Sequence, residues 1–194
     1  VLILCSDSTY AELSGYSESE SLVKESLSGI MMQSQGRLII ATFASLISRI
    51  QTIIDLAHLN GRNVFVTGRS MIRNLKVAKS TGHIKDPHSI IKPIKEVNKL
   101  APDKVVIIGT GSQGESASFI TKLSRQTHPE ISVTDRDTIV ISSSPIAGNE
   151  PVIGNVIDNL FRLGAKVIYD KVYRVHVHGH AKQEELKLML SITQ

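Results

Sequence analysis

Short apolar runs that do not alternate with polar residues do most to limit the fold of this chain. The runs are residues 37–42, 63–67, 104–108, 138–142 and 166–169. Strands that are apolar on both faces must be covered on both faces, and strands that alternate with helices pair in parallel. Apolar residues recur at helical spacing between most of these runs, as at Ile47, Ile50 and Ile54. The sequence therefore predicts an α/β fold with three layers, a mostly parallel, Rossmann-like sheet with helices on both faces.

Local signals place further elements. Ser17 and Glu20 have the spacing of a capping box, which predicts a helix from Ser17 to about Gln35 that Gly36 closes. Helices are also expected over 45–59, between 70 and about 80, over 155–163 and over 181–190, a loop over 81–93, and a strand over 1–5 with Cys5 in the core.

Length and composition favour a single domain over residues 1–194 with a polyanionic partner. A chain of 194 residues with 41% hydrophobic content can bury one core. Lysine and arginine exceed aspartate and glutamate by 22 − 18 = 4, which favours a polyanion. The single cysteine cannot form an internal disulfide, and no apolar stretch reaches the length of a membrane span. Aromatic residues make up only 4%, so a module that stacks bases on an aromatic platform is not expected.

Three histidines at alternate positions near the C-terminus are the densest functional signal. In an extended segment, His176, His178 and His180 lie on one face. Gly179 interrupts the segment, and a helix that follows it would leave His180 beside free backbone N–H groups, a corner that can hold a phosphate. The alternative is a polar edge strand that happens to carry imidazoles. A transition-metal site is less favoured, because the segment has no cysteine and no known metal spacing.

The ends of the predicted strands carry small, hydroxylated or charged residues, and ligands of parallel sheets bind beyond the carboxyl ends of the strands. Asp7 either forms a turn with its hydroxyl neighbours or faces His180. In the second case its carboxylate would raise the pKa of the imidazole and make it a proton donor. Arg69 could bind a phosphate or pair with a carboxylate. Ser112 and serines 142–144 either donate to a ligand or cap a helix.

The stretch Gly109-x-Gly111-x-x-Gly114 matches the dinucleotide-binding fingerprint by letter. It follows a middle strand rather than the first, and no clean acidic residue ends the next strand to hold a ribose hydroxyl. A tight turn that needs positive φ explains the glycines at least as well. A nucleotide-binding α/β enzyme therefore stays open as an alternative, as does a non-catalytic interaction domain.

Taken together, these motifs resemble the ribonuclease J group of metallo-β-lactamase/β-CASP nucleases. Each motif singly is weak, but their combination, in the expected order along almost the whole chain, is specific. The matching stretches are Ser6-Asp7-Ser8-Thr9, Gly36-Arg37 through Ala41-Thr42-Phe43-Ala44-Ser45, Gly68-Arg69-Ser70-Met71, Thr110-Gly111-Ser112-Gln113-Gly114-Glu115, Ser144-Pro145-Ile146 with Gly148-Asn149-Glu150, and Val175-His176-Val177 with Gly179-His180-Ala181.

The resemblance implies a β-CASP domain that clamps RNA over a two-metal zinc centre, which activates water for phosphodiester cleavage. Such enzymes act as 5′-3′ exonucleases and endonucleases in RNA processing and decay. Asp7 falls on the family's catalytic motif A acid and His180 on its motif B histidine. Ser45, Gly111, Ser112 and His176 fall where the family binds the RNA backbone or its 5′ monophosphate, and Arg69 and His178 are further phosphate-binding candidates.

The family's His-x-His-x-Asp-His metal motif does not occur in the sequence. We therefore expect an isolated β-CASP domain without the metallo-β-lactamase domain, which holds no metal pair, binds RNA weakly and does not cleave it. For the full-length protein the resemblance implies 5′-monophosphorylated RNA as the substrate, homo-oligomers, no membrane, and the cytoplasm or a plastid stroma as the location.

The chain also departs from the family pattern. His178 stands where serine is usual, Leu46 where asparagine is common, Ala147 where proline is common and Ser21 where arginine is common. An added imidazole at position 178 would strengthen a phosphate contact at low pH or invite adventitious zinc.

Overall fold

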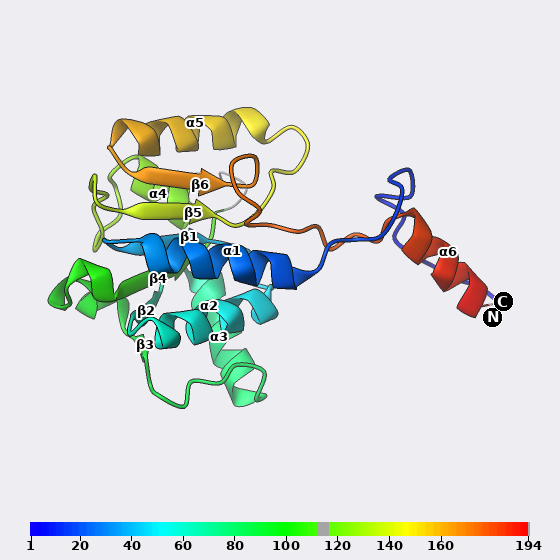
Figure 1. Cartoon of the computed structure of the whole chain (residues 1–194), viewed down its shortest axis with the longest axis horizontal. Coiled ribbons are helices and arrows are strands. Elements are labelled where there is room, and N and C mark those ends of the chain that lie inside the picture. The colour runs from blue at the N-terminus through cyan, green and yellow to red at the C-terminus, as the bar shows by residue number, and fades with distance from the viewer. Residues whose placement is uncertain (112–116, 194) are drawn as a thin grey trace.

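The computed structural model describes residues 1–111 and 117–193, and its centre is a six-stranded parallel sheet (Figure 1). The strands are β1 Leu38–Ala41, β2 Asn63–Val66, β3 Ile91–Lys92, β4 Val105–Gly109, β5 Thr138–Ile141 and β6 Lys166–Tyr169. Their order across the sheet is β3-β2-β4-β1-β5-β6. The apolar runs from 37 onwards therefore form strands as predicted. β3 is a correction, because it lies in the predicted loop 81–93 and pairs with β2 at the sheet edge.

Successive residues of each strand point to opposite faces of the sheet, and both faces are covered. On β1, Leu38 and Ile40 enter one hydrophobic core, while Ile39 and Ala41 enter the other. Helices α1, α2 and α3 cover the first face, and α4 and α5 cover the second (Figure 1). Each fully buried aliphatic side chain of this kind contributes roughly 1.5–3 kcal/mol. The predicted three-layer α/β architecture is confirmed.

The helices are α1 Glu20–Gln33, α2 Ile47–Leu59, α3 Arg69–Ser80, α4 Phe119–Ser124, α5 Glu150–Arg162 and α6 Gln183–Ile192, with 3₁₀ helices over Ile94–Lys99 and Pro102–Lys104. Three of them differ clearly from the sequence prediction, α1, α4 and α5. α5 begins before residue 155, because Pro151 and Glu150 in its first turn are good helix starters. α4 has only six residues, too few to show a helical period in the sequence.

The predicted caps of the first helix are wrong at both ends. Ser19, not Ser17, is the N-cap, and its side chain accepts from the N–H of Ser21. The hydroxyl of Ser17 donates instead to the Glu185 carboxylate at 2.6 Å. At the other end Ser34, not Gly36, is the C-cap. The S-x-x-E spacing was misleading, because a residue far along the chain competes for the Ser17 hydroxyl.

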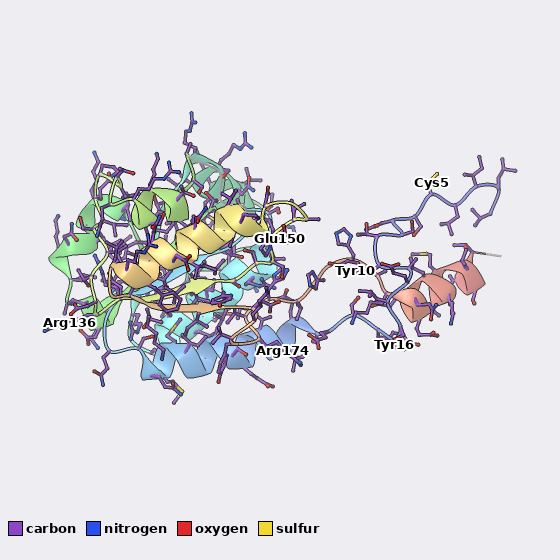
Figure 2. The ribbon with its side chains drawn as sticks, turned by 90° about the horizontal axis from the view of Figure 1, so that it is seen from above. Cys5, Tyr10, Tyr16, Arg136, Glu150 and Arg174 are labelled. Atoms are coloured by element: carbon purple, nitrogen blue, oxygen red, sulfur yellow. The ribbon has the colours of Figure 1, made fainter. Side chains whose placement is uncertain are left out.

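Two segments project together from one end of the sheet, and both chain termini lie at their far end (Figures 1 and 2). We call residues 1–19 the N-terminal arm, residues 178–193 the C-terminal arm, and residues 20–177 the body. A single parallel β-bridge joins Tyr10 to Lys182 among the described residues. All ten residues of α6 are at least partly exposed. The arms therefore contact each other more than they contact the body.

The arms overturn two sequence predictions. Residues 1–5 form no strand, and Cys5 is exposed rather than in the core. This apolar run stays irregular because no other described strand pairs with it. The histidine segment 174–179 is likewise not a strand. Within the described part of the chain, no helix is long and apolar enough to cross a membrane.

Candidate functional site

The structure brings Asp7 and His180 into direct contact, although 173 positions separate them. Asp7 Oδ2 lies 2.5 Å from His180 Nδ1, and Asp7 Oδ1 accepts the backbone N–H and the hydroxyl of Thr9 at 2.8 and 2.6 Å. The hydrogen bond from the Thr9 side chain and then the one from His180 hold the pKa of Asp7 far below its usual range. Asp7 is thus an ionised acceptor, so His180 must donate its Nδ1–H to it. A carboxylate that orients an imidazole in this way can support proton transfer.

Tyr10 fills the space between His180 and His178. Its hydroxyl oxygen is 3.0 Å from His178 Nδ1, and its ring meets the two imidazoles edge-on, with centroids 5.2 and 5.3 Å away. His178 also contacts the ring of His176 at a centroid distance of 5.2 Å. The three histidines are therefore linked by ring contacts that pass through Tyr10, whereas the predicted strand that would place them on one face does not form.

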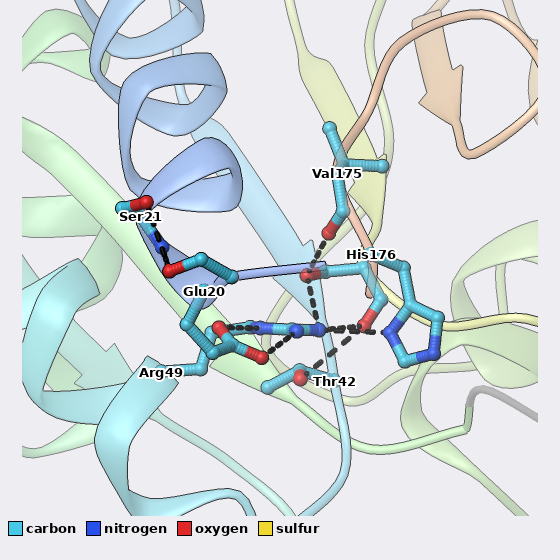
Figure 3. A network of polar contacts seen from close by, with 8 residues as sticks. Glu20, Ser21, Thr42, Arg49, Val175 and His176 are labelled. Atoms are coloured by element: carbon cyan, nitrogen blue, oxygen red, sulfur yellow. Dashed lines mark hydrogen bonds and ion pairs between the residues drawn. The ribbon is translucent and has the colours of Figure 1, made fainter. Parts of the chain in front are cut away.

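His176 lies where the body meets the C-terminal arm, and its ring is beside the buried guanidinium of Arg49 (Figure 3). Its Nδ1 is 3.0 Å from Arg49 Nη1. Burial first, and the Arg49 charge second, lower the pKa of His176 to about 4. Ser142, at the end of β5, joins the same network and donates its hydroxyl to the carbonyl of Val175 at 2.7 Å, so it does not cap a helix.

Two adjoining pockets open at the carboxyl ends of β1, β2 and β4. One of ≈ 300 Å³ is lined by Thr67, Gly68, Arg69, Ser70, Thr110, Ala117, Phe119, Lys122 and His128. The other of ≈ 320 Å³ is lined by Thr42, Phe43, Ala44, Ser70, Thr110, Gly111 and Ser118. Arg69 and Lys122 form no ion pair with any residue that the structure describes. Hydroxyls and unpaired cations at one edge suit a phosphate.

The remaining predicted binding residues are more scattered. Ser45 lines a different groove of ≈ 730 Å³, together with Arg73 and Val77. Ser112 lies outside the described residues. Ser143, next to Ser142, is 2% exposed, and its hydroxyl has no hydrogen-bond partner within 1–111 and 117–193.

Packing accounts for two glycines of the fingerprint-like loop. A Cβ at Gly109 would collide with the ring of Phe119, and one at Gly111 would collide with Ser118. Gly111 also has a φ of +117°, which other residues rarely adopt. The nucleotide-binding alternative therefore gains nothing from these positions.

The described residues do not fit a metal centre. They contain no group of three or more His, Cys, Asp or Glu side chains that could hold an ion. Asp7 and His180 form a pair at most, and their contact takes up one ligand atom of each, Asp7 Oδ2 and His180 Nδ1. A two-metal centre would need donors from elsewhere.

Sequence reasoning missed Arg49, Tyr10 and the pairing of Glu20 with Arg49. Arg49 is on the same helical face as Ile53, so a charged residue in an apolar stripe was a readable signal of a buried polar contact. Its Nε and Nη2 both donate to the Glu20 carboxylate. Nothing in the local sequence singles out Tyr10.

Polar pockets at the strand ends of a parallel sheet are typical of α/β domains that bind phosphate-bearing ligands. Residues 35–160 match the sequence profile of the family described as "Ribonuclease J, beta-CASP domain". The chain therefore belongs to the β-CASP domain family of ribonuclease J.

Similar curated proteins carry the same name. Ribonuclease J of Synechocystis sp. is 42% identical over 194 residues, which is 100% of this chain and 30% of that protein. Ribonuclease J of Thermus thermophilus is 41% identical over 193 residues, 100% of this chain and 34% of that protein. Ribonuclease J of Mycobacterium tuberculosis is 45% identical over 185 residues, 95% of this chain and 33% of that protein. The chain thus spans about a third of the length of the curated relatives it matches.

Proposed function

We propose that this chain is the RNA-binding β-CASP part of a ribonuclease J-type metal-dependent ribonuclease, a 5′-3′ exonuclease and endonuclease of RNA processing and decay. The Asp7–His180 contact carries the proposal, because it joins the two arms through the acid and the imidazole that the family resemblance assigns to catalysis. The ionised Asp7 holds the Nδ1–H of His180, which leaves Nε2 to exchange a proton with the leaving group or to donate to the scissile phosphate.

The substrate we propose is RNA with a 5′ monophosphate. Arg69 and Lys122, which form no ion pair with a described residue, and the neighbouring threonine hydroxyls support backbone contacts that do not depend on base sequence. We assign His176, Gly111 and Ser112 to the 5′ phosphate, and Ser45 and His178 to the flanking backbone. The net charge of +4 supports attraction of a polyanion.

The zinc pair that the family implies belongs, in this proposal, to a metallo-β-lactamase domain of the same protein, because the described residues do not form a metal site. Apolar side chains on the arms support a partner there: Leu2 is 98% exposed and Ile192 is 72% exposed. We further propose, from the family resemblance alone, that the full-length protein is a cytoplasmic homo-oligomer.

Fluorescence anisotropy with a short RNA tests the binding part. The 194-residue chain should bind a 5′-monophosphorylated oligoribonucleotide weakly and should prefer it to the same RNA with a 5′ hydroxyl. The logarithm of affinity should fall with the logarithm of salt with a slope of about −0.7 per phosphate contacted. Salt-independent binding, or thermal stabilisation by NAD(P) or ATP instead of RNA, would contradict the proposal.

RNA decay by the chain rejoined to its flanking segments tests the catalytic part. His180→Ala and Asp7→Asn should each slow decay, by roughly 10²–10⁴-fold for His180→Ala, since they remove a proton donor or its holder. Lys187→Ala in the same arm removes only an exposed pair with Glu184 and serves as the control. Full activity in both site variants would refute the assignment.

A further inference from the structure

Arg49 is a cation buried inside the body, and its hydrogen bonds reach the first residue of α1, the end of β5 and the histidine segment (Figure 3). Its side chain is 0% exposed and pairs with Glu20, the first residue of α1 after the N-terminal arm. On its other side, Nη1 donates to the carbonyl of Ser142 at 2.9 Å and to the Ser142 hydroxyl at 3.2 Å. The same Nη1 is 3.0 Å from Nδ1 of His176, two residues before the C-terminal arm begins.

The chemistry of the guanidinium settles the tautomer of His176. Arginine has only donors and stays charged at every accessible pH, so Nδ1 of His176 must offer its lone pair. The neutral ring then carries its hydrogen on Nε2. The Ser142 hydroxyl cannot take the place of Arg49, because its own hydrogen goes to the Val175 carbonyl.

We propose that Arg49 is a positioning residue that fixes His176 as an uncharged Nε2–H donor. That this donor meets a phosphate oxygen of RNA rests on the proposed function above. The assignment of the tautomer does not, because it follows from the contact between the two side chains.

The charged groups near His176 act in opposite directions, and the stronger influences favour the neutral ring. Arg49 from α2 and His178 from the same segment oppose a positive charge on it. Asp170, after β6, and Glu20, from α1, favour that charge, but they are the weakest influences, and burial outweighs both. His176 therefore stays neutral as the pH falls through the range where an ordinary histidine, with a pKa of about 6.5, would become charged.

His180 has the opposite arrangement. A carboxylate is an acceptor only, so Asp7 requires Nδ1–H on His180 and leaves Nε2 for proton exchange. Two imidazoles four positions apart thus have different tasks. His176 donates a hydrogen bond without titrating, and His180 is arranged to move a proton.

Nitrogen NMR of the 194-residue chain labelled with ¹⁵N-histidine tests the proposal without RNA. His176 signals, identified by their loss in His176→Gln, should show the neutral Nε2–H tautomer from pH 8 to about pH 5. In Arg49→Met the two tautomers should mix, and protonation should move up towards about pH 6.5. A wild-type ring with Nδ1–H, or an Arg49→Met ring with unchanged tautomer and titration, would overturn the proposal.

Glu20→Gln is the matched control, because it removes the ion pair but keeps Arg49 under the imidazole. Its His176 tautomer should match the wild type. A mixture of tautomers in Glu20→Gln would mean that the ion pair, and not Arg49 alone, determines the tautomer of His176. If Arg49→Met does not fold, the double variant Arg49→Met with Glu20→Gln leaves no carboxylate without its partner. The same mixed tautomers and raised titration of His176 are expected in it.

Binding of 5′-monophosphorylated RNA supplies a second readout. Arg49→Met should bind roughly twofold more weakly than wild type at pH 8, since about half of the rings would present the wrong nitrogen, and should recover part of this loss as the pH falls and His176 becomes charged. Arg49→Met with His176→Gln should show less recovery. Absent RNA binding together with the expected tautomers would reject the proposed function and leave the role of Arg49 intact.

Discussion

The body and the arms contain similar apolar sequence, yet only the body buries it. Ile39 in the central strand and Ile107 beside it are 0% exposed, whereas Leu2 is 98% exposed and Ile3 is 74% exposed. An apolar run becomes a buried strand only where neighbouring strands and helices supply partners on every side. The arms show what the same kind of sequence does when those partners are missing from the surroundings.

The polar groups differ between the two regions in the same way. In the body, the side chain of Arg49 is shielded from water, and its effect is to fix one ring in one tautomer. In the arms, the Asp7–His180 pair is half-exposed on both sides. Because solvent weakens exposed pairs, the arm contact orients groups without adding much stability.

The largest expected effect comes from removing a core side chain of the body. Ile107→Ala should lower the free energy of unfolding by roughly 2–5 kcal/mol, since it leaves a cavity between β4 and its covering helices. Leu2→Ala should change it by less than about 0.5 kcal/mol. Urea unfolding followed by circular dichroism measures both. If Leu2→Ala lowered the free energy of unfolding as much as Ile107→Ala, the difference in burial between the arms and the body would be contradicted.

Arg49→Met should have the next largest effect on stability, roughly 1–3 kcal/mol, because it leaves the Ser142 carbonyl without its donor and Glu20 without its partner. Its control in the arms is Lys187→Met, which breaks an exposed pair and should cost no more than about 0.5 kcal/mol. The same urea experiment applies. Equal unfolding midpoints for the two variants would mean that the contacts of Arg49 do not stabilise the body.

Tyr10→Phe should leave the unfolding midpoint of the body unchanged and act only within the arms. It removes the hydroxyl at Nδ1 of His178 but keeps the ring against His180. ¹⁵N NMR should therefore show a changed tautomer balance for His178 and little change for His180. A shift of the body midpoint would show that the arms and the body unfold as one unit.

The smallest expected effect is the weakening of the arm contacts at low pH. Hydrogen bonds lower the pKa of Asp7, mainly from Thr9, and that of Glu185, mainly from Ser17. A lowered carboxyl pKa means that these arm contacts contribute fully above about pH 4.5 and weaken only as the pH falls below the ordinary carboxyl range. Carbon NMR of the carboxyl groups measures this, with Thr9→Val and His180→Ala both expected to raise the pKa of Asp7, Thr9→Val more. Ordinary titration of Glu185, whose partner Ser17 lies in the other arm, would show that the arms are apart in solution.

The sequence was a good guide wherever the cause was local. Runs such as 138–142 are apolar enough to require cover on both faces, so strand identity and parallel pairing could be predicted. It was a poor guide at Ser17, where the local capping pattern was met but Glu185 accepts the hydroxyl. It was also wrong at Cys5, because burial depends on a partner and not only on hydrophobicity.

For the candidate site, the residue types were readable but most of their contacts were not. The resemblance placed Asp7 and His180 among catalytic residues, and the pair is in contact. The partner of Arg49 could not be foreseen, because β5 lies beside β1 only through the order of strands in the sheet, and this order brings Ser142 to α2.

By itself, the sequence determined that this protein is a parallel α/β domain. The spacing of apolar residues and the residues that end helices and strands act between near neighbours in the chain. It also determined which cationic, hydroxyl and imidazole side chains are present. Only the tertiary structure decided which atoms meet: it set Arg49 under His176, Asp7 against His180, and Tyr10 beside His178. Those contacts join residues more than a hundred positions apart, and their hydrogen-bond geometry is created by folding.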